Sequence, residues 1–409
     1  MIVRDLAFIP NDSPLISIQR ELRSSLSEEY APDELLLHSG GPLSDISQSS
    51  LLMGPPTHRT LFIQPENHQS LPTNQNPLDG DLIFHTSNPL IVKHQEWKSR
   101  SWVTVETSSA ESLSEAVRKT CRHECIQAPE GMPSLGSVTG ILNYDLVQWT
   151  SPVRIKHTPS TNSILGIMYR ISGYIFHNRS TNKIYLVADE NHPWSNITDI
   201  SSSTSHQSHP IDGDVKPLTN SDNHHADKIR QIIESIRGGH LYQLNYGRTW
   251  RGNSQIHPWE VFECLDSTNP APYSAWMNIP DLDFAVVSSS PELLLETDET
   301  SVFTRPIKGT RPRGDGIEAD QAEIMSLLKS RKEIAEHMML VDLERNDVRK
   351  IAKLGTTHWS DWRVESLSNV HHLVSTIQGN YRQDLDCIDA LQSLFPGGSI
   401  TGCPKDATI

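Results

Sequence analysis

The chain has 409 residues and a mass of 45.9 kDa, which at about 150 residues per domain predicts two or three units or one large mixed domain. Its 50 acidic and 35 basic residues give a formal net charge of −15, a balance that argues against a nucleic-acid-binding surface and against adhesion to anionic membranes. Hydrophobic residues make up 36% of the chain without an apolar run near the ~20 residues of a bilayer span, so fibrous, disordered and membrane-spanning classes are excluded.

The first half of the chain is predicted to be rich in strands. Glu34–His38 is an apolar run that ends at Ser39-Gly-Gly, which is typical of a strand entering a turn. Helical spacing follows between 110 and 126, at Leu113, Ala116, Val117 and Thr120. Further strands separated by turns are predicted at 140–146, 164–175 and 183–188, and a polar surface loop is predicted at 60–80.

The five cysteines are too few and too scattered for a disulfide framework. The N-terminus shows no signal-peptide pattern, so the cytoplasm is the expected compartment. One cluster, Cys121-Arg-His-Glu-Cys125, holds two thiols and an imidazole. A tetrahedral metal site needs a fourth ligand, and the sequence offers no second cluster nearby. A structural role is therefore predicted for this segment.

The composition changes between residues 195 and 225, where serine, histidine, asparagine and aspartate replace core-forming side chains. This composition predicts a linker or exposed loop, placed at 196–220. A helix is then predicted to begin at Ser221 or Asp222, both good N-cap residues, and to end at Gly238. The residues expected to form its buried stripe are Ile229, Ile232, Ile233 and Ile236.

Residues 241–250 alternate like a strand, which places Gln243 and Asn245 on one face. Buried amides need hydrogen-bond partners. The two side chains are therefore expected either to brace a loop or to line a wet cavity.

Residue types that carry chemistry gather in later segments. Residues 284–295 predict strand, turn and strand with Glu292 at the bend, and residues 303–313 place Lys308 in a turn framed by proline and glycine. The remaining segments are helices at 318–348, a short strand at 370–375 and a glycine-rich loop at 395–405. Because side chains alternate along a strand, His371 and His372 are expected to face opposite ways.

Taken in this order, the segments resemble the chorismate-utilising enzyme family. The matching strings are Tyr-Gln-Leu-Asn at 242–245, Ser-Ser-Pro-Glu at 289–292, Thr-Arg-Pro-Ile-Lys-Gly-Thr at 304–310, Ala-Glu-His-Met-Met-Leu-Val-Asp-Leu-Glu-Arg-Asn-Asp at 335–347, His-His-Leu-Val-Ser at 371–375 and Pro-Gly-Gly-Ser-Ile-Thr-Gly-Cys-Pro-Lys at 396–405. Any one string is a weak signal, but six of them in the family's order are specific. Lys308 resembles the aminodeoxychorismate synthase branch, because the sister enzyme anthranilate synthase typically has alanine there.

The resemblance implies amination of chorismate to 4-amino-4-deoxychorismate, in para-aminobenzoate and folate biosynthesis, with ammonia from a separate glutaminase subunit. It implies that the Lys308 amine attacks C2 of chorismate as the 4-hydroxyl leaves, and that ammonia then attacks C4 and displaces the lysine. Glu292 matches the family's general acid, and His372 matches a histidine that handles hydrogen bonds or protons near the departing hydroxyl. The alternatives are a surface lysine, a turn carboxylate in water and a satisfied core histidine.

An amine nucleophile must be uncharged, and neighbouring cations favour the uncharged form. The sequence places Arg305, Arg311 and Arg313 close to Lys308 along the chain. Two roles stay open for these arginines: they supply that positive charge, or they form salt bridges, as arginines commonly do.

The resemblance further implies Mg²⁺ between the ring carboxylate of chorismate and two glutamates, of which Glu336 matches the first. Mg²⁺ prefers oxygen ligands and keeps several waters, so few protein carboxylates are needed. Glu336 has an alternative partner in Lys332, four residues earlier on the helix. The positions that match substrate-binding residues are Gln243, Asn245, Thr310, Gly398, Ser399 and Thr401.

The fold that the resemblance implies is α+β, a large antiparallel two-sheet core wrapped by helices. Residues 1–195 are expected to form an N-terminal scaffolding or regulatory region, intertwined with a chorismate-binding catalytic domain at 221–409. Some family members bind tryptophan near a serine that matches Ser39, which is the candidate for a regulatory ligand. Family members continue beyond the position of residue 409, so the last part of the sheet and the second magnesium glutamate are expected to be missing.

Two other functions stay open at this point. One is anthranilate synthase component I of tryptophan biosynthesis, against which Lys308 and the Gln-Leu-Asn strand argue. The other is an inactive, truncated remnant that only binds a partner or a ligand.

Overall fold

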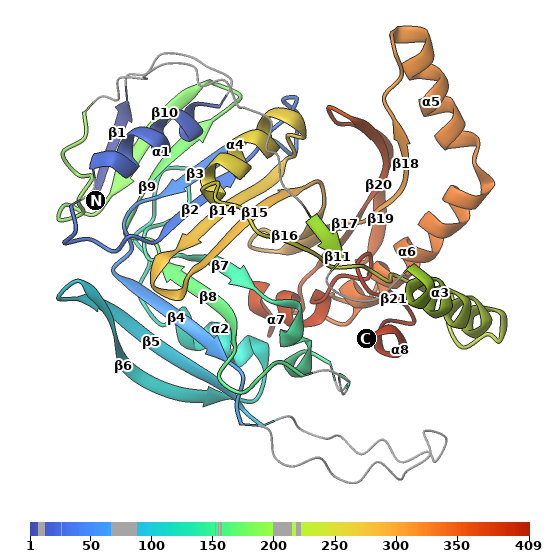
Figure 1. The fold of residues 1–409 in the computed structure, drawn as a ribbon, viewed down its shortest axis with the longest axis horizontal. Helices are drawn as coiled ribbons and strands as arrows, with labels where there is room; N and C mark the ends of the chain where they lie inside the picture. The colour runs from blue at the N-terminus through green and yellow to red at the C-terminus, as the bar shows by residue number, and fades with distance from the viewer. Residues whose placement is uncertain are drawn as a thin grey trace.

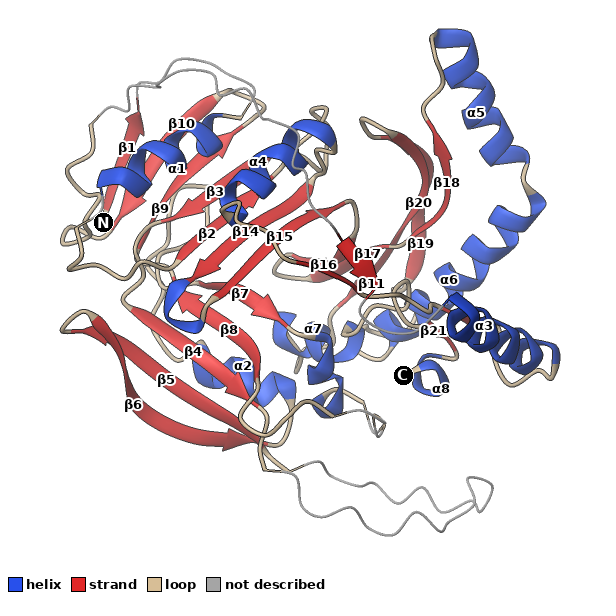
Figure 2. Ribbon diagram, viewed as in Figure 1, coloured by secondary structure: helices blue, strands red, loops and turns tan. Residues whose placement is uncertain are grey.

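The structure is a computed structural model that describes residues 1–6, 13–25, 27–66, 88–151, 153, 155, 158–198, 215–217 and 222–409. Within these ranges, three antiparallel sheets of five or more strands are joined and covered by helices (Figures 1 and 2). The predicted α+β class with an antiparallel core and covering helices is confirmed. None of the described helices is both long enough and apolar enough to cross a membrane.

The first sheet has seven strands in the order β1-β10-β9-β3-β2-β14-β15. Their bounds are β1 Ile2–Leu6, β2 Glu34–His38, β3 Ser49–Met53, β9 Gly173–Asn178, β10 Lys183–Ala188, β14 Tyr273–Ile279 and β15 Phe284–Ser290. Helices α1 (Pro14–Ser25) and α4 (Pro258–Thr268) cover one face with apolar side chains such as Leu15 and Phe262. Because side chains alternate along β2, Leu36 packs under these helices and Leu35 packs on the opposite face.

The second sheet has five strands in the order β6-β5-β4-β8-β7 and packs against the opposite face of the first sheet. Its strands are β4 His58–Ile63, β5 Leu90–Lys98, β6 Ser101–Ala110, β7 Val138–Leu142 and β8 Ile164–Arg170. Helix α2 (Leu113–Thr120) covers its outer side, capped by Ser112, and buries the residues at helical spacing that the sequence singled out. The two packed sheets form the predicted core.

The third sheet has five strands, β16 Leu293–Thr297, β17 Ser301–Arg305, β18 Ile307–Pro312, β19 His358–Ser366 and β20 Val370–Asn380. Strand β20 is its centre, because it pairs with β17 and then β18 along one edge and with β19 along the other. Helices α5 (Ile317–Lys329) and α6 (Arg331–Arg349) follow β18, as predicted. Helix α7 (Cys387–Leu394) connects the sheets, since Ile388 packs with the second sheet and Leu394 with the third.

The remaining elements are short, apart from one helix. They are β11 Val215–Pro217, α3 Asp222–Arg237, β12 Gln243–Leu244, β13 Trp250–Gly252, β21 Gly402–Cys403 and α8 Lys405–Thr408. The bounds of α3 confirm the prediction. The predicted buried stripe on it is wrong, because Ile233 and Ile236 are 40% and 37% exposed. The helix extends away from the sheets in Figure 1, so few side chains cover it.

Several predicted strands differ in extent from the observed ones. The single strand expected at 241–250 is reduced to β12 and β13, because it pairs only with the short strands β21 and β11. Strand β7 ends at Leu142 and a 3₁₀ helix, Tyr144–Trp149, follows, while the strand expected at 164–175 is the hairpin β8–β9. Residues 60–63 belong to β4 rather than to a loop, and most of the 60–80 and 196–220 segments lies outside the described residues.

The two halves of the chain share the first sheet. Strand β14, from the second half, pairs along β2 from the first half, and β15 pairs along β14. Strand β15 then leads through two residues to β16 of the third sheet. The N-terminal region is therefore intertwined with the part of the chain that carries the predicted site.

Candidate functional site

Lys308 lies in strand β18 and not in the turn that the sequence predicted. Only Pro306 separates β17 from β18, and both strands pair with β20, so the chain stays extended. The register shifts between Ile307 and Thr310 and forms a bulge at Lys308 and Gly309. Gly309 has a φ of 97°, a left-handed conformation that favours glycine. Because a bulge re-aims the side chain it carries, it holds the half-buried Lys308 in a defined direction.

Glu292 lies at the bend between β15 and β16, as predicted, and its carboxyl group is close to Lys308. Its Oε1 accepts a hydrogen bond from the backbone N–H of Ile307 at 3.0 Å. Burial raises the pKa of Glu292, against the opposing effects of the Ile307 N–H, the Ser399 hydroxyl and the charge of Lys308. A carboxyl group whose pKa is raised toward neutrality can act as a proton donor.

Thr310 and His372 face each other across β18 and β20. They are paired in register, and Thr310 Oγ1 lies 2.9 Å from His372 Nδ1. Burial lowers the pKa of His372, so its imidazole is neutral near pH 7. His371 is fully buried on the other face, 2.8 Å from both Asp320 Oδ1 and Ser366 Oγ. The predicted opposite orientation of the two histidines is confirmed.

The glycine-rich loop before β21 is braced by the segment that contains β12. Gln243 pairs with Cys403 in register, the Asn245 backbone N–H donates to the Thr401 carbonyl at 3.0 Å, and the Asn245 side-chain amide donates to the Ser399 carbonyl. Of the two roles expected for these amides, Asn245 has the first, because it braces a loop. This contact holds Ser399 beside Glu292.

Each of the three arginines near Lys308 is paired with carboxylates. The ion pairs are Arg305 with Glu365 and Asp45, Arg311 with Glu333, and Arg313 with Asp320. Of the two roles considered for these arginines from the sequence, the structure shows the salt bridges.

Glu336 lies on α6, the helix that packs against β18. Its Oε1 is 3.3 Å from Lys332 Nζ, the alternative partner considered from the sequence. One turn earlier, Glu333 packs near Gly309. In the part of the chain that the structure describes, no cluster of three or more histidine, cysteine or acidic side chains is arranged to hold a metal ion.

Glu336 nevertheless suits a hard cation. Mg²⁺ commonly binds one or two protein carboxylates and completes its shell with water and substrate oxygens. The Lys332 side chain is 74% exposed, and exposed ion pairs of this kind are weak, so a divalent cation can replace it.

Two buried carboxyl groups on α6, Glu344 and Asp347, were not assigned a role from the sequence. Glu344 Oε1 accepts a hydrogen bond from the Gly398 N–H at 2.8 Å. Asp347 forms ion pairs with Lys405 and, at 2.8 Å, with Lys350. Burial raises the pKa of Glu344 to about 7, opposed by the charge of Lys405. The signal that would have found Glu344 is its position on the same helical face as the apolar Leu340, Val341 and Val348.

Replacing Glu344 with glutamine is expected to change how folding stability depends on pH. The folded protein keeps a proton on Glu344 between the usual pKa of 4.5 and about 7, whereas the unfolded chain releases it. The free energy of unfolding of the native protein therefore falls by about 3 kcal/mol as the pH rises through this range. Glu344→Gln removes this contribution. Urea unfolding at pH 5 and pH 7.5 measures it, with the exposed Asp342→Asn as the control. Equal pH dependence in the native protein and Glu344→Gln would contradict the expectation.

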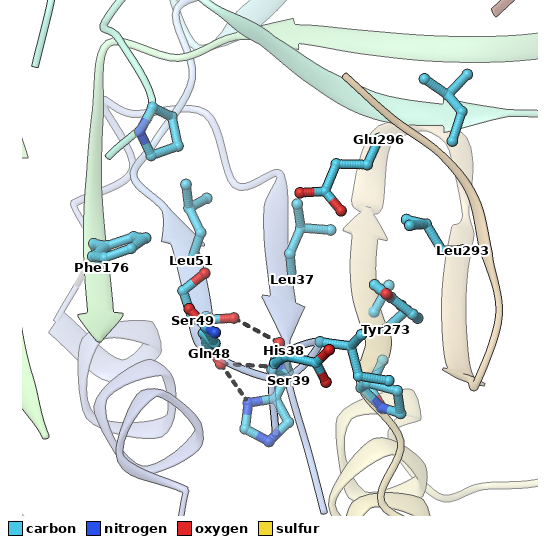
Figure 3. A pocket seen from close by; sticks show the side chains of 18 residues that line it. Leu37, His38, Ser39, Gln48, Ser49, Leu51, Phe176, Tyr273, Leu293 and Glu296 are labelled. Atoms are coloured by element: carbon cyan, nitrogen blue, oxygen red, sulfur yellow. Dashed lines mark hydrogen bonds between the residues drawn. The ribbon is translucent and has the colours of Figure 1, made fainter. Parts of the chain in front are cut away.

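Ser39 lies apart from this cluster, beside a cavity of about 530 Å³ between the first and third sheets. Figure 3 shows its apolar wall, which includes Leu51, Phe176 and Leu293, and the carboxylate of Glu296. The Ser39 hydroxyl donates to the Ser49 carbonyl at 2.6 Å. The cavity has the size and the mixed lining of a site for a small molecule with an apolar group.

His123, from the cysteine-flanked segment, lines a second cavity of about 190 Å³. Cys121 and Cys125 are free, exposed thiols. The described residues form no metal-binding cluster there, and the structural role of this segment stays a prediction.

The sequence of residues 73–409 matches the family model described as chorismate binding enzyme. A curated relative, anthranilate synthase component 1 from Haloarcula marismortui, is 46% identical over 185 residues, which cover 45% of this chain and 37% of that protein. Aminodeoxychorismate synthase component 1 from Klebsiella aerogenes is 31% identical over 344 residues, 80% of this chain and 72% of that protein. The match to the haloarchaeal relative thus spans less than two fifths of its length.

The fold is similar to a solved structure of anthranilate synthase component I from Streptococcus pneumoniae. The TM-score is 0.65 at 20% sequence identity, over 90% of this chain and 77% of that one. At this identity the likeness concerns the fold alone.

Proposed function

This chain belongs to the chorismate binding enzyme family, and from that membership we propose that it aminates chorismate with ammonia to 4-amino-4-deoxychorismate. The observation that carries the proposal is the proximity of Lys308, on the β18 bulge, to the half-buried acid Glu292, whose pKa its charge affects. An amine beside a proton donor provides both a nucleophile and a way to remove a hydroxyl group.

The proposed reaction has two steps that balance. In the first, the uncharged Lys308 amine forms a bond to C2, the ring double bond shifts, and the C4–O bond breaks. Glu292 gives its proton to the departing hydroxyl, which leaves as water. In the second step ammonia attacks C4, the double bond shifts back, and the lysine nitrogen leaves C2 and is released as the free amine. No oxidant or reductant is needed.

Neighbouring residues position the substrate in this proposal. The neutral His372, held by Thr310, accepts or donates a hydrogen bond near the departing hydroxyl. Ser399 links the glycine loop to Glu292. The backbone N–H groups of such a loop are suitable donors for a carboxylate of chorismate, which is a dianion.

Mg²⁺ is part of the proposal, with Glu336 as the residue of this chain that would hold it. When bound, the ion neutralises charge on the ring carboxylate and withdraws electrons from the ring. Ammonia is proposed to come from a separate glutaminase subunit, which ammonium salts can replace in an assay.

The test is to incubate the chain with chorismate, Mg²⁺ and ammonium and to separate the products by mass. We expect a product that retains the enolpyruvyl group and carries nitrogen at C4, and we expect its loss when EDTA removes the metal. Anthranilate as the product would support the second candidate instead. If no product forms when intact chorismate, Mg²⁺ and ammonium are all present, the result would support a role in binding only.

Anthranilate formation is the second candidate function, favoured by the 46% identity to the haloarchaeal anthranilate synthase component. The lysine at position 308 argues against it, because in the proposed reaction an amine at this position attacks the ring itself.

The cavity beside Ser39 is proposed to bind tryptophan as a regulatory ligand. We expect calorimetry to detect tryptophan binding but no binding of alanine, which lacks a large apolar group. Ala275→Leu fills the cavity and is expected to weaken tryptophan binding at least tenfold, because about 1.4 kcal/mol is a factor of ten. Val105→Leu, at the second cavity, is the control. Equal binding by both variants would place tryptophan elsewhere or exclude the site.

A further inference from the structure

The second cavity, of about 190 Å³, lies on the second sheet where helix α2 stops covering it. Under α2 the face of the sheet is apolar, with Phe62 on β4 and Val92 on β5. Side chains two positions further along each strand lie on the same face, and these are Thr60 and His94, which pair in register. Both line the cavity, together with Thr120 at the end of α2. The cavity is therefore built where one continuous face of the sheet changes from apolar to polar.

The lining of this cavity is polar, and its cations outnumber its carboxylates. Of the described residues that line it, four are arginine or lysine, two are glutamate and three are histidine, and Val105 is the one apolar side chain. The cavity is smaller than the sites of about 300–1,000 Å³ that hold drug-sized ligands. Its size and its lining therefore suit a small anion.

Three of the four lining cations are paired with carboxylates. The pairs are Arg59 with Asp33 and Asp281, Lys119 with Glu115, and Arg122 with Glu106. Arg170 differs, because it forms no ion pair with a carboxylate in the part of the chain that the structure describes. Its Nη2 lies 2.7 Å from Nδ1 of the imidazole of His58 instead. A guanidinium has five N–H donors, so most of those of Arg170 are available to a ligand.

The surroundings of His58 show that the cavity is short of negative charge. Burial and then the charge of Arg170 lower the pKa of His58 to about 4, and His123 and Lys98 act in the same direction. Glu96 Oε1, 3.8 Å from His58 Nε2, opposes them, but Glu96 is itself in an ion pair with Lys98. The imidazole is therefore neutral near pH 7 and can accept an N–H of Arg170. A bound anion would supply the negative charge that the lining lacks.

We propose that this cavity is a binding site for a small oxyanion of the phosphate class, either inorganic phosphate or the phosphate group of a small ester. Arg170 is the residue assigned to bind it, because a guanidinium presents paired donors to two oxygens of a phosphate. The lining comes from β4, β5, β6, β8, the end of α2 and the residues after it, and includes no residue of the third sheet (Figure 1). The inference is therefore independent of the reaction proposed for Lys308 and Glu292.

The experiment is calorimetry of the native chain with inorganic phosphate, at constant ionic strength and in a buffer without other oxyanions. We expect saturable binding that is weakened about tenfold or more in Arg170→Gln, which loses the charged donor. Arg100→Gln is the control, because Arg100 lies in the turn between β5 and β6 of the same sheet and is paired with the exposed Glu28. Absence of binding to the native chain, or equal binding by Arg170→Gln, would overturn the proposal.

A second variant tests the site without removing a buried contact. Val105 lines the cavity from β6 and is 48% exposed, so Val105→Glu adds a carboxylate at an accessible position. We expect it to abolish phosphate binding. Val103→Glu is the matched control, because Val103 is 42% exposed on the same strand and does not line the cavity. Equal losses in the two variants would indicate general charge repulsion and would contradict a specific site.

A third measurement uses the native chain and NMR of its labelled histidines, with the His58 signal identified by its absence in His58→Gln. Phosphate is expected to raise the titration midpoint of His58, because an anion beside the imidazole favours its charged form. An unchanged midpoint at saturating phosphate would refute binding at this place. Glycerol 3-phosphate then identifies the source of the anion. Tighter binding than that of inorganic phosphate assigns the site to a phosphate ester, and binding that is no tighter assigns it to free phosphate.

Discussion

Lys308→Ala is expected to abolish formation of 4-amino-4-deoxychorismate, with a loss of at least about 10³-fold, or to redirect the reaction to another product. Removing a nucleophile eliminates the covalent path, and losses of this size or larger are usual. The bulge at Lys308 and Gly309 makes the effect specific to this amine, because no other lysine of the described site lies on β18. Product analysis by mass gives the loss directly.

Lys329→Ala is the matched control, since this lysine is exposed at the end of α5. It should retain full turnover. A covalent adduct on Lys308, seen by intact mass without any reductant when chorismate and Mg²⁺ are present without ammonia, would support the same role independently. Unchanged turnover and product in Lys308→Ala would refute the nucleophile assignment and leave family membership as the only conclusion.

Glu292→Gln is expected to lower turnover by about 10² to 10⁴-fold, the range for loss of a general acid. Glutamine can still accept the hydrogen bond from the Ile307 N–H, so the backbone stays in place while the proton is lost. Burial raises the pKa of Glu292, and in the proposed reaction the protonated form is the active one. Activity of the native chain should therefore be highest below that raised pKa and fall as the pH increases through it.

The pH dependence provides the control for this variant. In Glu292→Gln, the decrease of activity at high pH should disappear, because no proton remains to be released at this position. Glu299 is an exposed glutamate in the turn before β17. Glu299→Gln should keep both the rate of turnover and its decrease at high pH. A variant at Glu292 that retains the rate would assign the proton donor to another residue, with His372 the first to examine.

Short-range patterns in the sequence were sufficient for much of the fold. The spacing of Leu113, Ala116 and Val117 predicted α2 and its buried face. The Ser-Pro-Glu string placed Glu292 at a bend between two strands, as observed. These predictions succeed because alternation, helical spacing and turn residues act over a few neighbouring positions.

The errors occurred where distant partners decide the structure. Proline and glycine around Lys308 suggest a turn locally, but pairing with β20 keeps that segment extended. The isoleucines of α3 have helical spacing without a covering surface among the described residues. Arg305, close to Lys308, forms ion pairs with carboxylates far away in the sequence, Asp45 and Glu365. No role was predicted for Glu344 because its partner, Gly398, belongs to a loop more than fifty positions later in the chain.

The sharing of the seven-stranded sheet has a consequence for how such a protein can evolve and be engineered. Strands β14 and β15 complete a sheet begun by β1, β2 and β3, and β15 continues directly to Glu292. A fragment that starts after residue 222 would leave β14 with an open, apolar edge, and such edges promote aggregation. Exchanging one half of the chain for that of a relative would therefore require the strand contacts of both halves within this sheet to be matched.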